Sequence, residues 1–227
     1  MTCYIAERTN LSLVAGVRSY DDPCGIARAL DVIGERWALL VVRELILGPK
    51  RFVDLRAGLG KLSANVLAQR LRELEEAGVV NRRTLPPPAG SRVYELTERG
   101  RELEPVLLAL GRWGRDAPFP PEAPPLSVDA AVLALPTTFE PQNARGVTAR
   151  VELRLGHDRF LARVRRGRFD VSRHEDAGAD AGLETDPATL ASLLWHGARL
   201  ADAEDEGRAR ASGDRAALER FLTLFRP

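Results

Sequence analysis

Five prolines fall within ten residues in the stretch APFPPEAPPL, residues 117–126. Proline lacks a backbone N–H and its ring clashes with the preceding helical turn, so neither a helix nor an internal strand can cross this stretch. Proline-rich runs are extended and semi-rigid. The sequence therefore predicts two folded parts, at 21–115 and 127–227, joined by a linker at 116–126, with an N-terminal extension or arm at 1–20.

The bulk composition indicates a soluble globular protein. Of the 227 residues, 44% are apolar and 29% are charged, which is ordinary for such proteins. The N-terminus lacks the long apolar segment of a signal peptide, and no apolar run is long enough to span a membrane. Two cysteines and three scattered histidines give no disulfide framework and no metal spacing. We expect a cytoplasmic protein that uses no metal or cofactor and contacts no membrane.

The first part has the order of elements typical of a winged helix-turn-helix. Apolar periodicity, an N-cap at Ser63 and stops at Gly48-Pro49 and Gly78 set the boundaries. We expect helices at 24–33, 35–48, 51–59, 63–78 and 98–114, and a proline-tipped hairpin of strands at 79–84 and 92–96.

The helix at 63–78 has an apolar and a polar face. At 100° per residue, Leu67, Leu71 and Leu74 form the stripe that packs on the core. The opposite face holds Asn65, Gln69, Arg72 and Glu76. Asn and Gln can pair with adenine, and Arg can pair with guanine, through two hydrogen bonds in the major groove. The helix is therefore a candidate recognition helix rather than an ordinary surface helix.

The charge distribution agrees with this interpretation. Between Lys50 and Arg92 there are nine basic and four acidic residues, although the whole chain has a net charge of only +1. Arginines on the hairpin are placed to reach phosphates, which contribute affinity without reading sequence. The candidate DNA-binding residues are Arg51, Lys61, Ser63, Asn65, Val66, Gln69, Arg70, Arg72, Arg82, Arg83 and Arg92.

Several dispersed blocks over residues 24–114, about 40% of the chain, resemble the HxlR family of bacterial transcriptional regulators. They are Cys24, Asp31 to Trp37, LVVRELILGPKRFVDL, LAQRLRELEEAGVV and YELTERGREL. Gly25 departs from the proline that often follows the family's cysteine. The resemblance implies a homodimer that binds an inverted-repeat operator in double-stranded DNA. By this resemblance, the residues in the dimer contact or the core are Ile26, Leu30, Ile33, Leu107, Leu110 and Trp113. For the two tryptophans Trp37 and Trp113, we interpret the role as core packing.

Cys24 has two interpretations. The resemblance makes it a candidate redox sensor, and a helix N-terminus would lower the pKa of its thiol. The neighbouring Asp21 and Asp22 would raise that pKa, and free cysteine is often a small packing residue.

The second part is predicted to be α+β, with antiparallel strands covered by helices. The elements expected are a helix at 127–136, a strand at 147–156, two strands within 159–174 that turn at Arg166-Gly167, a helix after Asp186-Pro187, and a strand and helix around Gly213-Asp214. This order, with VELRLGHDRFLARVRRGRF and GRARASGDRAALERFLTLF, resembles the sterol-carrier-protein domain. The resemblance implies an apolar pocket lined by Phe160, Leu161, Leu193, Leu194, Trp195, Phe221 and Leu224, although the same residues could fill an ordinary core.

No catalytic motif is present, so we do not expect an enzyme. The first hypothesis is a dimeric, sequence-specific DNA-binding repressor whose C-terminal domain binds an apolar small-molecule effector. In the second, the C-terminal domain serves only dimerisation and packing. The third is a lipid or small-molecule carrier. Residues 1–16 are either an upstream extension, if translation starts at Val17, or an arm that swaps across the dimer.

Overall fold

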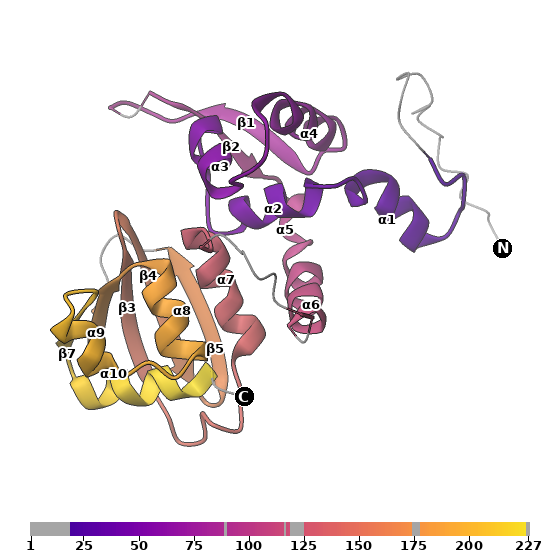
Figure 1. Cartoon of the computed structure of the whole chain (residues 1–227). Helices are drawn as coiled ribbons and strands as arrows, with labels where there is room; N and C mark the ends of the chain where they lie inside the picture. Colours follow the sequence, from indigo (N-terminus) through magenta and orange to yellow (C-terminus); the bar gives the residue numbers. More distant parts are fainter. Residues whose placement is uncertain (1–18, 89, 116, 119–124, 174–177, 226–227) are drawn as a thin grey trace.

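The computed structural model describes residues 19–225 except 89, 116, 119–124 and 174–177 (Figure 1). Most of the predicted arm and of the proline-rich linker therefore lie outside the described residues. Two separate hydrophobic cores are present. One is built from residues between Val32 and Leu107, and the other from residues between Val128 and Phe225, against which Leu47 also packs. We call the parts that carry them the N-terminal unit and the C-terminal unit.

The N-terminal unit consists of helices followed by a hairpin and two further helices. They are α1 (Gly25–Ile33), α2 (Ala38–Ile46), α3 (Phe52–Gly58), α4 (Ala64–Glu76), β1 (Val80–Thr84), β2 (Arg92–Leu96), α5 (Glu98–Arg101) and α6 (Glu104–Gly114). The predicted helices and hairpin of residues 24–96 are confirmed, with ends shifted by up to three residues. Leu67, Leu71 and Leu74 of α4 are buried in this core, as predicted.

The single helix predicted at 98–114 is wrong. The chain forms α5 and α6 instead, with a break at Glu102–Leu103. Pro105 lies in the first turn of α6. Its ring excludes the carbonyl that a continuous helix would place there, whereas the first turn of a new helix tolerates proline.

The C-terminal unit is a five-stranded sheet with helices. Its elements are α7 (Val128–Thr138), β3 (Ala149–Leu155), β4 (Asp158–Arg165), β5 (Arg168–Arg173), β6 (Ala181–Thr185), α8 (Pro187–Trp195), α9 (Leu200–Asp205), β7 (Ala209–Gly213) and α10 (Arg215–Leu222). The strand order is β5-β4-β3-β6-β7. The predicted turn at Arg166-Gly167 is confirmed, and both residues have positive φ, as a two-residue hairpin turn requires.

The prediction of antiparallel strands is wrong at one pair. Strand β6 runs parallel to β3, with Leu153 opposite Leu183. The sequence analysis expects no strand at Ala181–Thr185, so it does not include β6 or the crossover that leads to it. Helix α9 was missed as well.

One face of the sheet is apolar and is covered by α7, α8 and α10 (Figure 1). Alternate residues such as Val151, Leu153, Leu183 and Phe160 are buried there. Among the described residues, no helix has the length and apolar character needed to cross a lipid bilayer.

The two units meet where α7 begins. Lys50, just before α3, forms ion pairs with Glu44 of α2 (2.7 Å) and with Asp129 of α7. Ser127, the N-cap of α7, donates a hydrogen bond to Glu44 (2.7 Å). Further along, α6 and α7 lie so close that a Cβ on Gly111 would be 2.7 Å from Thr137 Cγ2.

Replacing Gly58 of α3 by alanine should destabilise the fold. The added Cβ would lie 2.8 Å from the Cδ of Glu44, whose carboxylate is held in place by Lys50 and Ser127. Overpacking of this kind typically costs about 1–3 kcal/mol. Urea unfolding of Gly58→Ala should show that loss, whereas Gly25→Ala, where a Cβ meets nothing within 4 Å, should be neutral. Equal stability of the two variants would contradict this packing.

Ser63→Ala should destabilise α4. The Ser63 hydroxyl accepts a hydrogen bond from the Val66 N–H (3.4 Å), and loss of such an N-cap costs about 0.5–2 kcal/mol. Ser63→Gly should cost only a few tenths of a kcal/mol, because glycine is itself a tolerated N-cap. Thermal unfolding of the two variants distinguishes this capping role from a purely DNA-contacting one, which would leave both as stable as the parent chain.

Candidate nucleic-acid interface

Helix α4 presents a polar face away from the core. Its three buried leucines fix its rotation, and Asn65, Gln69, Arg72 and Glu76 are all exposed. The helix and the β1–β2 hairpin lie at the end of the molecule remote from the C-terminal unit (Figure 1). The face predicted from periodicity is therefore open to a large partner.

The polar groups on and around this face differ in how they are held. Gln69 donates a hydrogen bond from Nε2 to Glu73 (3.0 Å). Asn65, Arg72 and Lys61 are exposed and form no hydrogen bond or ion pair with any described residue. A ligand could engage Asn65, Lys61 and Arg72 directly, while Gln69 would first have to leave Glu73.

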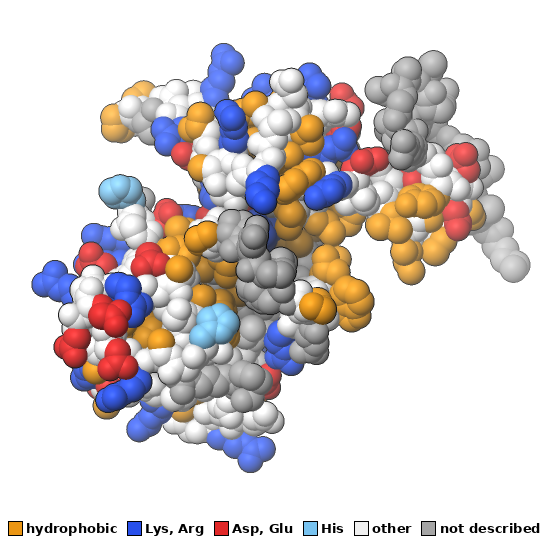
Figure 2. Space-filling view, in the orientation of Figure 1, with side chains coloured by type: hydrophobic (Ala, Val, Ile, Leu, Met, Phe, Trp, Pro, Cys, Tyr) orange, Lys and Arg blue, Asp and Glu red, His pale blue; other side chains and the backbone are white. Residues whose placement is uncertain are grey.

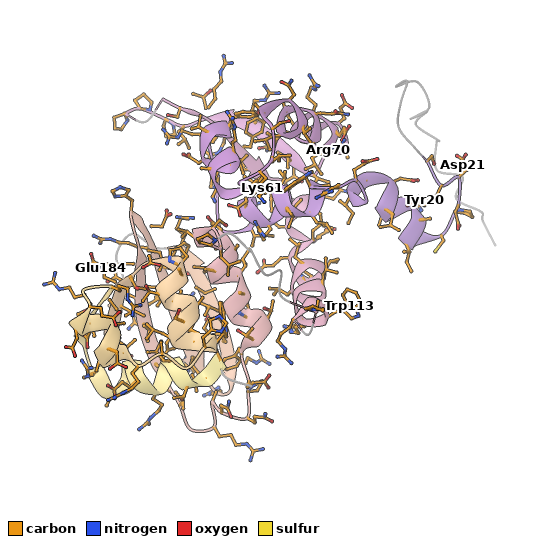
Figure 3. All side chains as sticks on the ribbon, in the orientation of Figure 1. Tyr20, Asp21, Lys61, Arg70, Trp113 and Glu184 are labelled. Carbon is orange, nitrogen blue, oxygen red and sulfur yellow. The ribbon has the colours of Figure 1, made fainter. Side chains whose placement is uncertain are left out.

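Arg70 occupies a different environment from the other predicted contacts (Figure 3). Its side chain is only 11% exposed and pairs with Glu73 (2.5 Å) and Glu35 (3.6 Å). Val66 is half-buried against the core. The structure therefore does not bring Arg70 onto the open face of α4, and it gives Val66 a packing contact.

The hairpin is attached to α4 by a salt bridge. Arg82 of β1 donates two hydrogen bonds to Glu75 (3.1 and 2.7 Å), and its guanidinium lies 5.3 Å from the centre of the Tyr94 ring. The hydrogen bonds that Arg82 donates to Glu75, together with the nearby Tyr94 and the charge of Glu75, raise the pKa of Arg82. Arg83 pairs with Glu95 across the hairpin (2.6 Å). The hairpin position is thus fixed relative to α4, which is what a wing needs to follow a DNA backbone in register.

The remaining predicted contacts lie at the edges of this surface. Arg51 is the N-cap residue of α3 and forms a two-pronged pair with Asp54 (2.8 and 2.9 Å). The hydrogen bond from Arg51 outweighs partial burial and lowers the pKa of the Asp54 carboxyl. Arg92, at the start of β2, is exposed and has no ionic partner among the described residues.

Arg56 is a further exposed cation beside this surface that the predicted set does not include. It is exposed on α3 and forms no ion pair with a described residue. Its position in the sequence could have indicated its exposure. Arg56 directly follows the buried Leu55, and neighbouring positions of a helix point in different directions, so Arg56 lies outside the apolar stripe of α3.

Among the described residues, the two most exposed large apolar side chains lie on helices α1 and α6 (Figure 2). Ile26 is 73% exposed and Trp113 is 81% exposed, and Leu30, Val106 and Leu110 are also exposed. No residue of α6 is buried. The interpretation of Trp113 as a core residue is wrong, because its ring points away from the described chain (Figure 3). Of the other predicted positions, Ile33 is buried and Leu107 is half-buried against the core.

Cys24 is exposed and is the N-cap residue of α1. The backbone N–H groups of Ile26 and Ala27, in the first turn of α1, lower the pKa of its thiol. Asp22 accepts the Cys24 N–H (2.8 Å). Within the described part of the chain, no group of three metal-binding side chains comes together.

The residues predicted to line a ligand pocket form part of the C-terminal packing. Phe160, Leu193, Leu194, Phe221 and Leu224 belong to the core, and Trp195 is half-buried and donates to Thr138 (3.1 Å). Leu161 is buried on the other face of β4, since side chains alternate along a strand. Two surface hollows lie elsewhere. One, of about 270 Å³, is bounded by Arg154, Glu184 and Arg210, and the other, of about 630 Å³, lies beside the Arg166 turn.

Comparisons with known proteins find relatives of the N-terminal unit. The family model of the HxlR-like helix-turn-helix matches residues 32–119. The HTH-type transcriptional regulator YvaP of Bacillus subtilis is 38% identical over 89 residues, which are 39% of this chain and 82% of that protein. The solved structure of the reduced form of the transcriptional regulator YodB from B. subtilis is 34% identical, covers 41% of this chain and 93% of that chain, and has a TM-score of 0.38.

The structure of the redox regulator HypR in its oxidized form is 36% identical and covers 43% of this chain and all of that chain, with a TM-score of 0.39. The match to the family model ends before the C-terminal unit begins. By its sequence, the chain belongs to the HxlR-like helix-turn-helix family of transcriptional regulators.

Proposed function

We propose that the protein is a sequence-specific DNA-binding regulator in which α4 enters the major groove and the hairpin follows the adjacent phosphates. The observation that carries the proposal is the open face of α4, with Asn65 and Arg72 unengaged by described residues and with the hairpin held beside it by Arg82 and Glu75. Side chains on the first turns of a recognition helix are the ones that reach base edges. Glu75 and Glu76, at the other end of α4, mark where the helix leaves the DNA.

The proposal includes a homodimer that binds an inverted repeat. Its support is the exposed apolar side chains of α1 and α6, because a cluster such as Val106, Leu110 and Trp113 on one helix is typical of an interface. A two-fold interface would pair each surface with its own copy and would present two α4 helices to two half-sites.

For the C-terminal unit we propose a sterol-carrier-like domain that controls the DNA-binding unit, and repression as the direction of control. A sheet with one face covered by helices supports that fold. The closed packing of Phe160, Leu193 and Phe221 favours a packing role over an open pocket. An apolar effector would have to open this core and bind one dimer geometry better than the other. In a carrier protein, the polar face of α4 would have no role.

Cys24 enters the proposal as a candidate thiol sensor. Its exposure and the lowered pKa of its thiol support reactivity.

The experiment that tests the proposal is recovery of genomic DNA fragments by the full chain at low salt, followed by a salt titration of the recovered sequence. Specific binding with a clearly negative slope of log affinity against log salt is expected, because phosphate contacts release counterions. A chain that retains no fragment, or that binds all fragments equally at every salt concentration, would contradict it.

Replacing Arg72 or Gln69 by alanine should weaken specific binding by about 1–3 kcal/mol per lost base contact. The loss should be larger for Arg72, because Gln69 must first break its hydrogen bond to Glu73. Fluorescence anisotropy with the recovered operator measures the effect. Arg220→Ala, which removes an exposed arginine from α10, is the matched control and should bind as the parent does. An unchanged footprint for both α4 variants would refute the groove assignment.

Trp113→Glu should convert a dimer into a monomer, since a carboxylate would be buried in the apolar contact. Sedimentation equilibrium gives the mass directly. The control is Val53→Glu, which alters an apolar side chain of α3 that is 62% exposed and lies outside the α1–α6 surface. A parent chain that is already monomeric at micromolar concentration would contradict the dimer.

A further inference from the structure

A buried ionic cluster joins the two units at the turn that precedes α3. Lys50 lies between the carboxylates of Glu44 and Asp129, whose side chains are 0% and 2% exposed. Arg173, at the end of β5, pairs with Asp129 (2.9 Å) and with Asp158. Charges removed from water at this depth are costly unless they are paired, so each member holds the others in place.

The cluster contacts the backbone as well as side chains. Arg173 donates from Nε to the Leu47 carbonyl (3.2 Å), in the turn between α2 and α3. Lys50 exchanges two backbone hydrogen bonds with Tyr94 of β2 (3.0 and 2.8 Å). Both ends of the α2–α3 turn are therefore tied down, one by the C-terminal unit directly and the other through Lys50.

A continuous set of contacts runs from this cluster to α4. The Tyr94 ring, on the residue paired with Lys50, lies under the Arg82 guanidinium. Arg82 in turn binds Glu75 of α4. On the other side, the Glu44 carboxylate packs over Gly58 of α3, where a side chain would overlap it.

Burial raises the pKa of the Glu44 carboxyl, but the Lys50 ammonium and the hydrogen bonds from Lys50 and Ser127, with Arg43 nearby, outweigh it and leave the pKa lowered. The cluster thus stabilises the ionised form of Glu44. A neutral group in its place, or in place of Asp129, would leave Lys50 buried beside one carboxylate instead of two.

This inference rests on the DNA-binding function proposed above. We propose that Asp129 and Arg173, in the C-terminal unit, are positioning residues for DNA recognition. They hold the α2–α3 turn in place and thereby determine the placement of α3, α4 and the hairpin. The C-terminal unit then acts on operator affinity without touching DNA. Any ligand or modification that shifts α7 or β5 would move the DNA-binding surface through the same contacts.

The decisive variant is Asp129→Asn in the full chain, which keeps the shape of the side chain and removes its charge. Operator affinity should fall about 2- to 30-fold, the range of coupling through such networks, and the ratio of operator to non-specific affinity should fall with it. Amide hydrogen exchange at residues 47–58 should speed up in the free protein, while the core amides of β3 and β4 stay protected. Asp170→Asn is the matched control, because Asp170 also pairs with an arginine, Arg163, but lies exposed on the same sheet.

Lys50→Met and the double variant complete a thermodynamic cycle. Coupling between positions 50 and 129 in operator affinity is expected, because each loses its partner when the other is changed. Additive effects, or an Asp129→Asn chain that binds the operator and exchanges amides like the parent, would overturn the inference and leave the DNA-binding function intact. If Asp129→Asn does not fold, Arg173→Met, which releases the Leu47 carbonyl and leaves Lys50 paired, decides the same question. If the parent chain binds no DNA, the proposed function fails, and the exchange at 47–58 still decides whether the cluster positions the turn.

Discussion

The structure depends on one ammonium group, that of Lys50, held between two buried carboxylates from different units. Glu44 and Asp129 could not both be buried without a cation between them, and Lys50 could not be buried without them. Because α7 begins at this point and α3 follows Lys50 directly, the same contact fixes both the first helix of the C-terminal unit and the entry to the helix-turn-helix. Apolar packing would join the units with less geometric definition, since it is non-directional.

The candidate DNA surface uses its polar groups in two ways. Arg82 and Arg51 are paired with nearby carboxylates and keep the hairpin and α3 in place, whereas Arg72 and Lys61 have no such partner among the described residues. Because exposed pairs of this kind are worth little in stability, their contribution is to orientation. A DNA phosphate could bind Arg82 only if Arg82 released Glu75. Because the Arg82–Glu75 pair also holds the hairpin beside α4, phosphate binding by Arg82 and the position of the hairpin are linked.

Much of the N-terminal unit could be predicted from the sequence, because its helices have clear apolar periodicity and marked ends. The buried leucines of α4 and the exposed position of Arg72 followed from that periodicity. Other features could not be predicted, because they depend on pairs distant in the chain. Lys50 and Asp129 are 79 positions apart, and the parallel pairing of β6 requires a crossover that local patterning does not record. Arg70 and Trp113 show the same limit, since periodicity does not say which side chains of a helix meet a neighbouring element, as Arg70 meets Glu35, and which stay exposed, as Trp113 does.

If the buried cluster holds the two units together as one rigid body, residual dipolar couplings of the full chain without DNA will show it. Amides of α2 to α4 and amides of β3, β4 and β6 are measured in the same aligned sample and fitted to the structure. One alignment tensor is expected to fit both sets, with the relative orientation of α2 and α7 unchanged. Two tensors of different magnitude and direction would mean that the units move independently, and would contradict the claim.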